Sequence, residues 1–409
     1  MVPEGWKEET LQEITKEKIS YGIVQAGPHV DDGVPYIKSS DVGGDIDVNR
    51  LQKTAVEIHQ KYRRSAVHPD DIVFSLRGNI ARTSIVPAEL AEANLTQGTA
   101  RISVNALNDT KFVYYKLASS PILNRINALS KGSTFKEISL EELRKVKLPL
   151  PPLPEQRKIA KILATWDKAI ATTEKLIAAS QQQKKALMQQ LLSGKKRLTS
   201  PETGQPFEGE WENTLVSTTA KCFSGGTPSR TNDEYYGGTI PWITSGKLND
   251  RFVESVNEYI TESGVSNSSA KYVAQGALLI AMYGATAGKV AINRMQSATI
   301  NQAVLALEVK EAHSNLFLFY LLEKEMEKAL TLVQGGQPNL NAAIIKGIKI
   351  KLPRLDEQQK IAAVLTAADK EIEVQQAKLA HLKQEKKALM QQLLTGKRRV
   401  TIDEMEISS

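Results

Sequence analysis

The sequence predicts an α+β fold of two homologous domains, each followed by one long helix, with the two helices paired as an antiparallel coiled coil of pseudo-twofold symmetry. One segment occurs twice, at a shift of 202 residues without insertion or deletion. The blocks that precede the two copies share the same order of strands and glycine turns. The predicted boundaries are 1–152 for the first domain, 153–198 for the first helix, 199–352 for the second domain, 353–400 for the second helix and 401–409 for a tail.

The repeated segment covers residues 155–198 and 357–400, and 23 of its 44 positions are identical. Apolar residues recur in it at alternating steps of four and three, which is the spacing of a coiled-coil seam. Gly194 and Gly396 stand where a left-handed residue ends a helix. Each copy therefore predicts one helix of about 40 residues. Two amphipathic helices in unrelated cores would not need to share one length.

Polar residues interrupt the predicted seam at matching places in both copies. Thr173 corresponds to Gln375, and Lys184 corresponds to Lys386. Polar residues in a seam weaken it but fix its register. The equal lengths and matching interruptions predict that the helices pair within one chain, in antiparallel orientation.

The blocks before the helices match at corresponding strands and helices. The matched strand regions are 34–40 with 240–246, 70–78 with 276–284, 95–104 with 300–309, and 146–148 with 348–350. A helix is predicted over 111–129 in the first block and over 315–332 in the second, each preceded by capping residues. The two blocks are therefore predicted to be diverged copies of one α+β domain.

Composition indicates an ordinary globular protein with a mild basic excess. Apolar residues make up 41%, charged residues 24%, and the net charge is +7. Cys222 is the only cysteine, and the five histidines do not cluster with it at metal-ligand spacing, so neither a disulfide nor structural zinc is expected. No signal peptide or membrane-spanning run is visible, so a cytoplasmic location is expected.

Catalytic signatures are missing from the sequence. The stretch 284–290 resembles a P-loop but is one residue short and ends in valine. Glu308 and Lys310 have a spacing found in metal-dependent nucleases, which keeps a nuclease as a remote alternative. Hydrolase, metalloprotease, dinucleotide-binding and adenine-methyltransferase motifs are absent. The chain is predicted to be non-catalytic and to hold no metal.

Side chains suited to DNA lie at the predicted strand ends of both blocks. Arginine and lysine suit guanine, asparagine and glutamine suit adenine, and hydroxyls suit phosphate oxygens. Such a residue taken alone is more often a solvated loop residue than a DNA contact, so the prediction depends on recurrence at corresponding places. The candidates are Lys38, Ser39, Arg77, Asn79, Arg82, Gln97 and Lys131 in the first block, and Arg230, Ser245, Lys247, Lys289, Asn301 and Gln302 in the second.

Along nearly its whole length the chain resembles the specificity subunits of type I restriction-modification systems. The resemblance rests on the two diverged domains and on the repeated motif Lys-Lys-Ala-Leu-Met-Gln-Gln-Leu-Leu-x-Gly-Lys, together with Pro-Leu-Pro-Glu-Gln-Arg-Lys-Ile-Ala at 152–160 and Leu-Asp-Glu-Gln-Gln-Lys-Ile-Ala at 355–362. It implies a subunit without an active site or cofactor of its own that binds double-stranded DNA through target-recognition domains. Its implied partners are two modification subunits that use S-adenosylmethionine to methylate adenine and, through them, restriction subunits that use ATP and Mg.

The helix length also predicts how a target is divided. Each helix would be about 60 Å long. If the helices pair antiparallel, the domains at their starts would lie up to that distance apart, which is about 17 base pairs of DNA. A target in two separated parts is therefore expected. Sequence identity extends to positions outside the seam, and these predict docking sites for partners at Met188, Gln189, Met390 and Gln391. The alternative is a coiled-coil adaptor with two protein- or RNA-binding domains.

Overall fold

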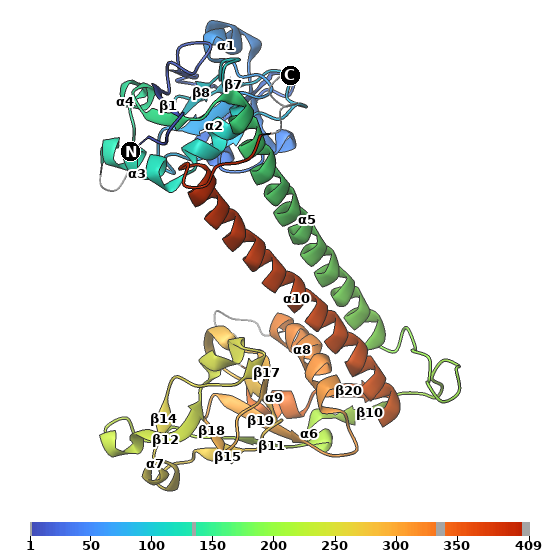
Figure 1. Cartoon of the computed structure of the whole chain (residues 1–409). Coiled ribbons are helices and arrows are strands. Elements are labelled where there is room, and N and C mark those ends of the chain that lie inside the picture. Colours follow the sequence, from blue (N-terminus) through green and yellow to red (C-terminus); the bar gives the residue numbers. More distant parts are fainter. Residues whose placement is uncertain (1, 133–135, 333–339, 403–409) are drawn as a thin grey trace. The chain divides into compact units, whose positions relative to one another are not determined.

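The computed structural model describes residues 2–132, 136–332 and 340–402, so most of the predicted tail, 401–409, lies outside the described residues. The chain divides into two units, Met1–Glu174 with Ala377–Ser409, and Lys175–Gln376. Each unit contains one domain, the first part of the helix that follows it, and the last part of the other long helix. Each domain mixes helices and sheets, as predicted (Figure 1).

The first domain is built on three small sheets. The largest is antiparallel, in the order β2 (Ser20–Tyr21), β8 (Thr99–Ile102), β5 (Ile72–Ser75) and β6 (Thr83–Ile85). The second has the order β4 (Gln52–Thr54), β3 (Val34–Ile37) and β7 (Asn94–Leu95), and β1 (Lys7–Thr10) pairs with β9 (Lys147–Leu150). Strand β5 is buried on both faces, because Ile72 and Phe74 join one apolar cluster and Val73 joins another.

The helices of the first domain correct one prediction. They are α1 (Val56–Lys61), α2 (Thr110–Leu117), α3 (Ser120–Leu129) and α4 (Leu140–Arg144), with short 3-10 turns at Ser39–Asp41, Val48–Arg50 and Arg63–Ser65. The single helix predicted over 111–129 is wrong, because the chain leaves the helical conformation at Ser119, with φ −74° and ψ 143°. Pro121 has no N–H and would clash with the carbonyl one turn earlier, so it is accommodated only in the first turn of a new helix.

The second domain repeats this plan with an additional strand in each of its two larger sheets. One sheet has the order β11 (Ala220–Ser224), β19 (Val304–Val309), β16 (Leu278–Ala281), β17 (Val290–Asn293) and β13 (Phe252–Val253). Another has the order β14 (Tyr259–Ile260), β12 (Tyr236–Ile243), β18 (Ala298–Ile300) and β15 (Lys271–Val273), and β10 (Glu212–Leu215) pairs with β20 (Lys349–Leu352).

The helices of the second domain are α6 (Val216–Thr219), α7 (Glu262–Ser266), α8 (Asn315–Leu332) and α9 (Ala342–Lys346). Its 3-10 turns are Asp233–Tyr235, Ser245–Asn249 and Gly284–Thr286. The predicted helix over 315–332 is confirmed by α8. No proline interrupts it, unlike the corresponding helix of the first domain.

The two repeated segments each form one long helix, α5 (Leu153–Leu191) and α10 (Leu355–Leu393), of 39 residues each. Gly194 and Gly396 follow them with φ of +70°, the left-handed conformation predicted for both helix ends. The paired helices are labelled in Figure 1. The predicted pair of equal helices is confirmed.

Ion pairs show that the helices are antiparallel. In the first unit, Lys386 Nζ lies 2.5 Å from Asp167 Oδ1, and in the second Lys184 Nζ lies 2.5 Å from Asp369 Oδ1. The two lysines are among the polar interruptions of the predicted seam, and each meets an acid on the facing helix. Each acid also accepts a hydrogen bond from a buried phenol, Tyr115 at 2.6 Å and Tyr320 at 2.7 Å. Burial and the adjacent carboxylate raise the pKa of both phenols.

A second matched ion pair joins the end of each helix to the start of the other. Arg399 binds Glu155 through two hydrogen bonds of 2.6 and 2.7 Å, and Arg197 binds Glu357 through two of 2.7 Å. Both glutamates are only 1% exposed. The apolar ends of the helices enter the domain cores beside them, Leu393 in the first unit and Leu191 in the second. Each core therefore needs residues from both repeats.

A buried lysine fastens the first domain to the end of α10. Lys116 donates a hydrogen bond to the carbonyl of Leu394 and lies 5.0 Å from the ring of Trp6. A cation is favourable at the C-terminal end of a helix. Burial, together with the charge of Arg125, lowers the pKa of Lys116 to about 7. Lys324 makes the corresponding bond to Leu192 in the second unit, at 3.2 Å.

Replacing Arg197 by alanine is expected to destabilise the protein, because it leaves the carboxylate of Glu357 buried without its cation. The expected loss is about 3 kcal/mol, the lower part of the range for breaking a buried ion pair, because Arg197 itself is partly exposed. Urea unfolding followed by circular dichroism measures it.

The matched control is Lys196→Ala, which removes a neighbouring exposed cation. Adding Glu357→Gln to Arg197→Ala should recover part of the loss. Equal stability of the Arg197→Ala and Lys196→Ala proteins would contradict the assignment.

Candidate nucleic-acid interface

The ends of three chain segments converge at one edge of the first domain. The carbonyl of Gly98 accepts hydrogen bonds from the Leu76 backbone N–H and from the Ser39 hydroxyl, both at 2.8 Å. The Thr96 N–H donates to the carbonyl of Ile37 at 3.1 Å. These bonds bring together three segments that carry predicted DNA-contacting residues, those around Ser39, Arg77 and Gln97.

The second domain makes the same backbone bonds at the corresponding edge. The Met282 N–H donates to the carbonyl of Ala303 at 2.8 Å, and the Asn301 N–H donates to that of Ile243 at 3.1 Å. These bonds bring together the segments that carry Ser245, Asn301 and Gln302. The two domains therefore place corresponding segments at equivalent edges, and the contact of their side chains with DNA stays a prediction.

A glycine permits the loop at each edge to cross the neighbouring strand. A Cβ atom on Gly22 would lie 1.8 Å from the carbonyl oxygen of Leu95, and one on Gly225 would lie 1.8 Å from that of Ile300. No side chain fits at such distances. The loops that begin at Gly22 and Gly225 are therefore held against the strand ends by backbone contact.

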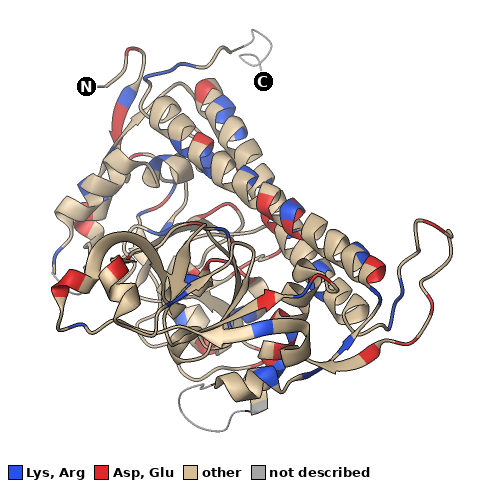
Figure 2. Cartoon of the chain, turned by 90° about the horizontal axis from the view of Figure 1, so that it is seen from below, with Lys and Arg blue, Asp and Glu red and all other residues tan. Residues whose placement is uncertain are grey.

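Several candidate cations at these edges are paired with acids. Arg77 Nε lies 2.8 Å from Glu137, Arg230 Nη2 lies 2.7 Å from Glu258, and Lys247 Nζ lies 2.8 Å from Asp250. Residues of both signs are interspersed over the domains and the long helices (Figure 2). Neither edge is a uniformly basic surface, so the pairing of each cation matters for DNA contact.

The other first-domain candidates surround the same edge. Lys38 Nζ donates to Gln52 at 3.2 Å, and the backbone of Lys131 pairs with Glu137, beside Arg77. Asn79 and Arg82 lie in the turn between β5 and β6, where the Asn79 carbonyl accepts from the Arg82 N–H at 3.4 Å.

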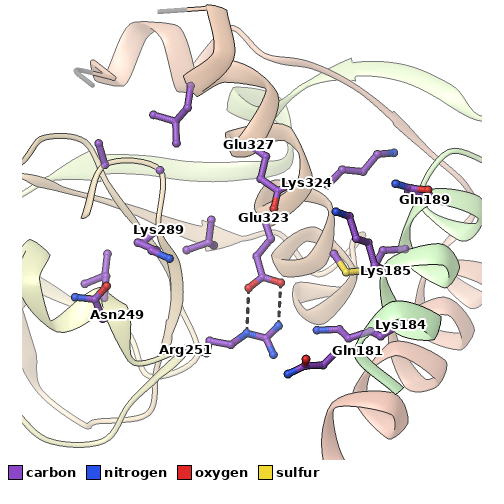
Figure 3. Close-up of a pocket in the computed structure, with 16 residues that line it drawn as sticks. Gln181, Lys184, Lys185, Gln189, Asn249, Arg251, Lys289, Glu323, Lys324 and Glu327 are labelled. Atoms are coloured by element: carbon purple, nitrogen blue, oxygen red, sulfur yellow. Dashed lines mark hydrogen bonds and ion pairs between the residues drawn. The ribbon is translucent and has the colours of Figure 1, made fainter. Parts of the chain in front are cut away.

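Lys289 lies in a different setting from the other second-domain candidates. It lines a cavity of about 600 Å³ between α5, α8 and the turn before β17 (Figure 3). Met188 and Gln189, predicted as partner-contacting residues, line the same cavity. Arg251 spans one side, with hydrogen bonds of 3.0 and 2.9 Å to Glu323 and an ion pair of 2.8 Å to Asp369. Lys289, which is predicted to contact DNA, and two residues predicted to contact partner subunits thus line the same cavity.

Part of the reasoning for the docking sites needs correction. Met188 and Met390 are half-buried and pack against the second and first cores, respectively. Their identity in the two repeats therefore has a reason within the chain. Gln189 and Gln391 are exposed at corresponding positions, so they remain the predicted docking residues that a contact within the chain does not explain.

The remote nuclease alternative gains no support from the geometry. Glu308 lies on β19 and its carboxylate pairs with Lys221 on β11 at 3.0 Å. Among the described residues, no three histidines, cysteines, aspartates or glutamates are grouped to hold a metal ion. Within the same residues no helix is long and apolar enough to cross a membrane.

Sequence reasoning missed the residues that hold these candidates in place. Glu137 and Glu258 are distant in sequence from the arginines they bind, and Trp242 resembles any buried strand residue. Of the residues that shape these edges, only Gly22 and Gly225 could have been recognised in the sequence, since each begins a loop rich in turn-forming residues before a strand.

Two diverged copies of one domain, with matching edges that carry polar and cationic side chains, define a protein with two separate recognition surfaces on a helical scaffold. The family model described as the type I restriction modification DNA specificity domain matches residues 3–180 and 209–384. The chain belongs to this family of DNA specificity proteins.

Individual relatives agree with that family. The chain is 32% identical to the Type I restriction enzyme EcoBI specificity subunit of Escherichia coli over 39% of this chain and 35% of that protein. It is 28% identical to the MjaVIII specificity subunit of Methanocaldococcus jannaschii over 72% of each protein. The solved type I restriction-modification S subunit of M. genitalium shares the fold, with a TM-score of 0.58 and 16% identity, over 96% of both chains.

Replacing Gly225 by alanine is expected to destabilise the second unit, because the new methyl group would meet the Ile300 carbonyl at 1.8 Å. The expected loss is about 3 kcal/mol, the upper part of the range for overpacking. Gly246→Ala is the matched control, because a Cβ atom there has no neighbour within 4 Å. Thermal unfolding compares them, and similar midpoints for the two variants would refute the close-contact argument.

Proposed function

We propose that this chain is the specificity subunit of a type I restriction-modification complex, and that its two domains read the two parts of a split double-stranded DNA target. The observation that carries the proposal is that both edges share one backbone geometry but present different side chains. Arg77 in the first domain stands where the second has Tyr283, and Gly98 stands where the second has Ala303. Two such surfaces would read two different base sequences.

The chain supplies recognition and no chemical step in this proposal. Partner modification subunits would bind S-adenosylmethionine and methylate adenine, and restriction subunits would use ATP and Mg. The chain itself would bind none of these cofactors and would act in the cytoplasm. The family match favours DNA over the alternative of an adaptor that binds protein or RNA.

Two modification subunits are proposed to bind each chain. The support is the repeat itself, because Gln189 and Gln391 are exposed at corresponding positions in the two helices. Each lies next to a methionine that packs on a domain core. Two equivalent surfaces would accept two copies of one partner.

Replacing residues 1–150 by the same block of a homologous specificity subunit should change only one half of the recognised sequence. The other half should stay the same, because each domain has its own edge and core. Selection of bound duplexes from a random DNA library, using the subunit assembled with its modification partner, measures both halves. A change in both halves would show that the domains do not read independently.

Gln189→Glu should weaken one of two docking surfaces, since it places a charge in the contact. Native mass spectrometry of the complex should then show a one-to-one species beside the two-to-one species. The matched control is Gln183→Glu on the same exposed stretch, because Glu385 already occupies the corresponding position of the other repeat. A two-to-one complex that both variants leave unchanged would place the docking surface elsewhere.

A further inference from the structure

The loop that begins at Gly225 is fixed along its length. The Trp242 indole N–H donates to the carbonyl of Gly226 at 3.2 Å, and the Tyr236 hydroxyl donates to that of Pro228 at 2.5 Å. The hydroxyl of Thr227 is bonded to the side-chain oxygen of Gln302. Proline removes further backbone freedom. The end of the loop, Arg230, therefore starts from a defined backbone position.

The guanidinium of Arg230 is held on two sides. It lies over two aromatic rings, 4.5 Å from the centroid of Tyr236 and 5.2 Å from that of Trp242. Its Nη2 atom lies 2.7 Å from Glu258 Oε2. The two rings attract the cation and the carboxylate pairs with it, so the position of the guanidinium is restricted from both sides. The side chain is still 58% exposed. Nη2 carries two N–H groups, so one can face Glu258 while the other forms a parallel pair with the N–H of Nε or Nη1.

A cavity of about 240 Å³ opens beside this cluster. Trp242 and Glu258 line it together with Lys247 and Thr244. The corresponding strand end of the first domain has Tyr36 instead of Trp242, and its hydroxyl bonds to Gln52 at 2.7 Å. The position of Trp242, which contacts Arg230 in the second domain, is thus occupied in the first by a residue with a different contact, as expected of surfaces that read different bases.

We propose that Arg230 reads a guanine in the DNA half-site of the second domain, and that Glu258 is a positioning residue for that contact. Arginine recognises guanine through two parallel hydrogen bonds to O6 and N7 in the major groove. A guanidinium whose position is already restricted by neighbouring groups loses less freedom when it makes them. The assignment rests on the proposed function, since it names a base contact of that DNA-binding surface.

Glu258 gives the contact its selectivity. A free arginine would bind any nearby phosphate, which adds affinity without sequence information. The Glu258 carboxylate repels a nearby phosphate and offsets part of the charge of Arg230, whereas a guanine that enters beside the cavity presents neutral acceptors to the donors that remain. Glu258 therefore disfavours the non-specific mode and keeps the specific one.

The test uses the subunit assembled with its modification partner and a random duplex library. Arg230→Ala should reduce the preference for guanine at one position of one half-site by about tenfold or more, because it removes both donors of the double contact. The other half-site should be unchanged, which also shows that the protein is folded.

Glu258→Gln should raise binding to non-specific duplex about two- to fivefold and reduce the preference at the same guanine. Glu254→Gln is the matched control, because it removes the same charge from an exposed position in the same segment of the chain. It should leave base preference unchanged. These two outcomes together would support the positioning role.

Three other results would each contradict a different part of the proposal. If Arg230→Ala weakened all sequences alike, Arg230 would be a phosphate contact and the assignment would be overturned. If Glu258→Gln behaved as Glu254→Gln, the carboxylate would act only through net charge. A wild-type complex without any sequence preference would instead overturn the proposed function.

Discussion

Two buried carboxylates, Glu155 and Glu357, determine how the rest of the chain must be arranged. Each lies in the first turn of a long helix, almost without solvent, and its charge is compensated by an arginine that follows the end of the other helix. A buried charge without its partner is costly, so each helix must end beside the start of the other. Helix length, antiparallel direction and domain packing are all consequences of that requirement.

The constraint also explains why the helices and the domains have diverged so differently. A helix residue such as Lys184 contacts Asp369 on the facing helix, and its repeat, Lys386, contacts Asp167. The same contact is therefore made twice, and each copy must supply both a lysine and an aspartate to it. The side chains at the edges of the two domains are under no such constraint, because backbone hydrogen bonds make the geometry that the two edges share. Side chains at those edges were therefore free to change without loss of the fold.

Most of the architecture could be predicted from the sequence, because repetition and periodicity are local signals. The seam, the glycine ends and α8 are all visible in the order of residues. The break at Ser119 was missed, although Pro121 was the available warning. The candidate interface was harder, because Arg230 depends on Glu258 and Trp242, which are near it only after folding. Lys289 faces a cavity beside two helices, which strand position alone could not show.

The duplicated glutamate and arginine pairs also affect how new members of this family could arise by recombination. A domain exchanged between the two positions, or between two chains, meets the same helix start on one side and the same helix end on the other. The repeated helices thus offer the same attachment site at both positions, and a domain can be exchanged as one unit. Selection can then act on one recognition surface at a time, without renewed adaptation of the scaffold that carries it.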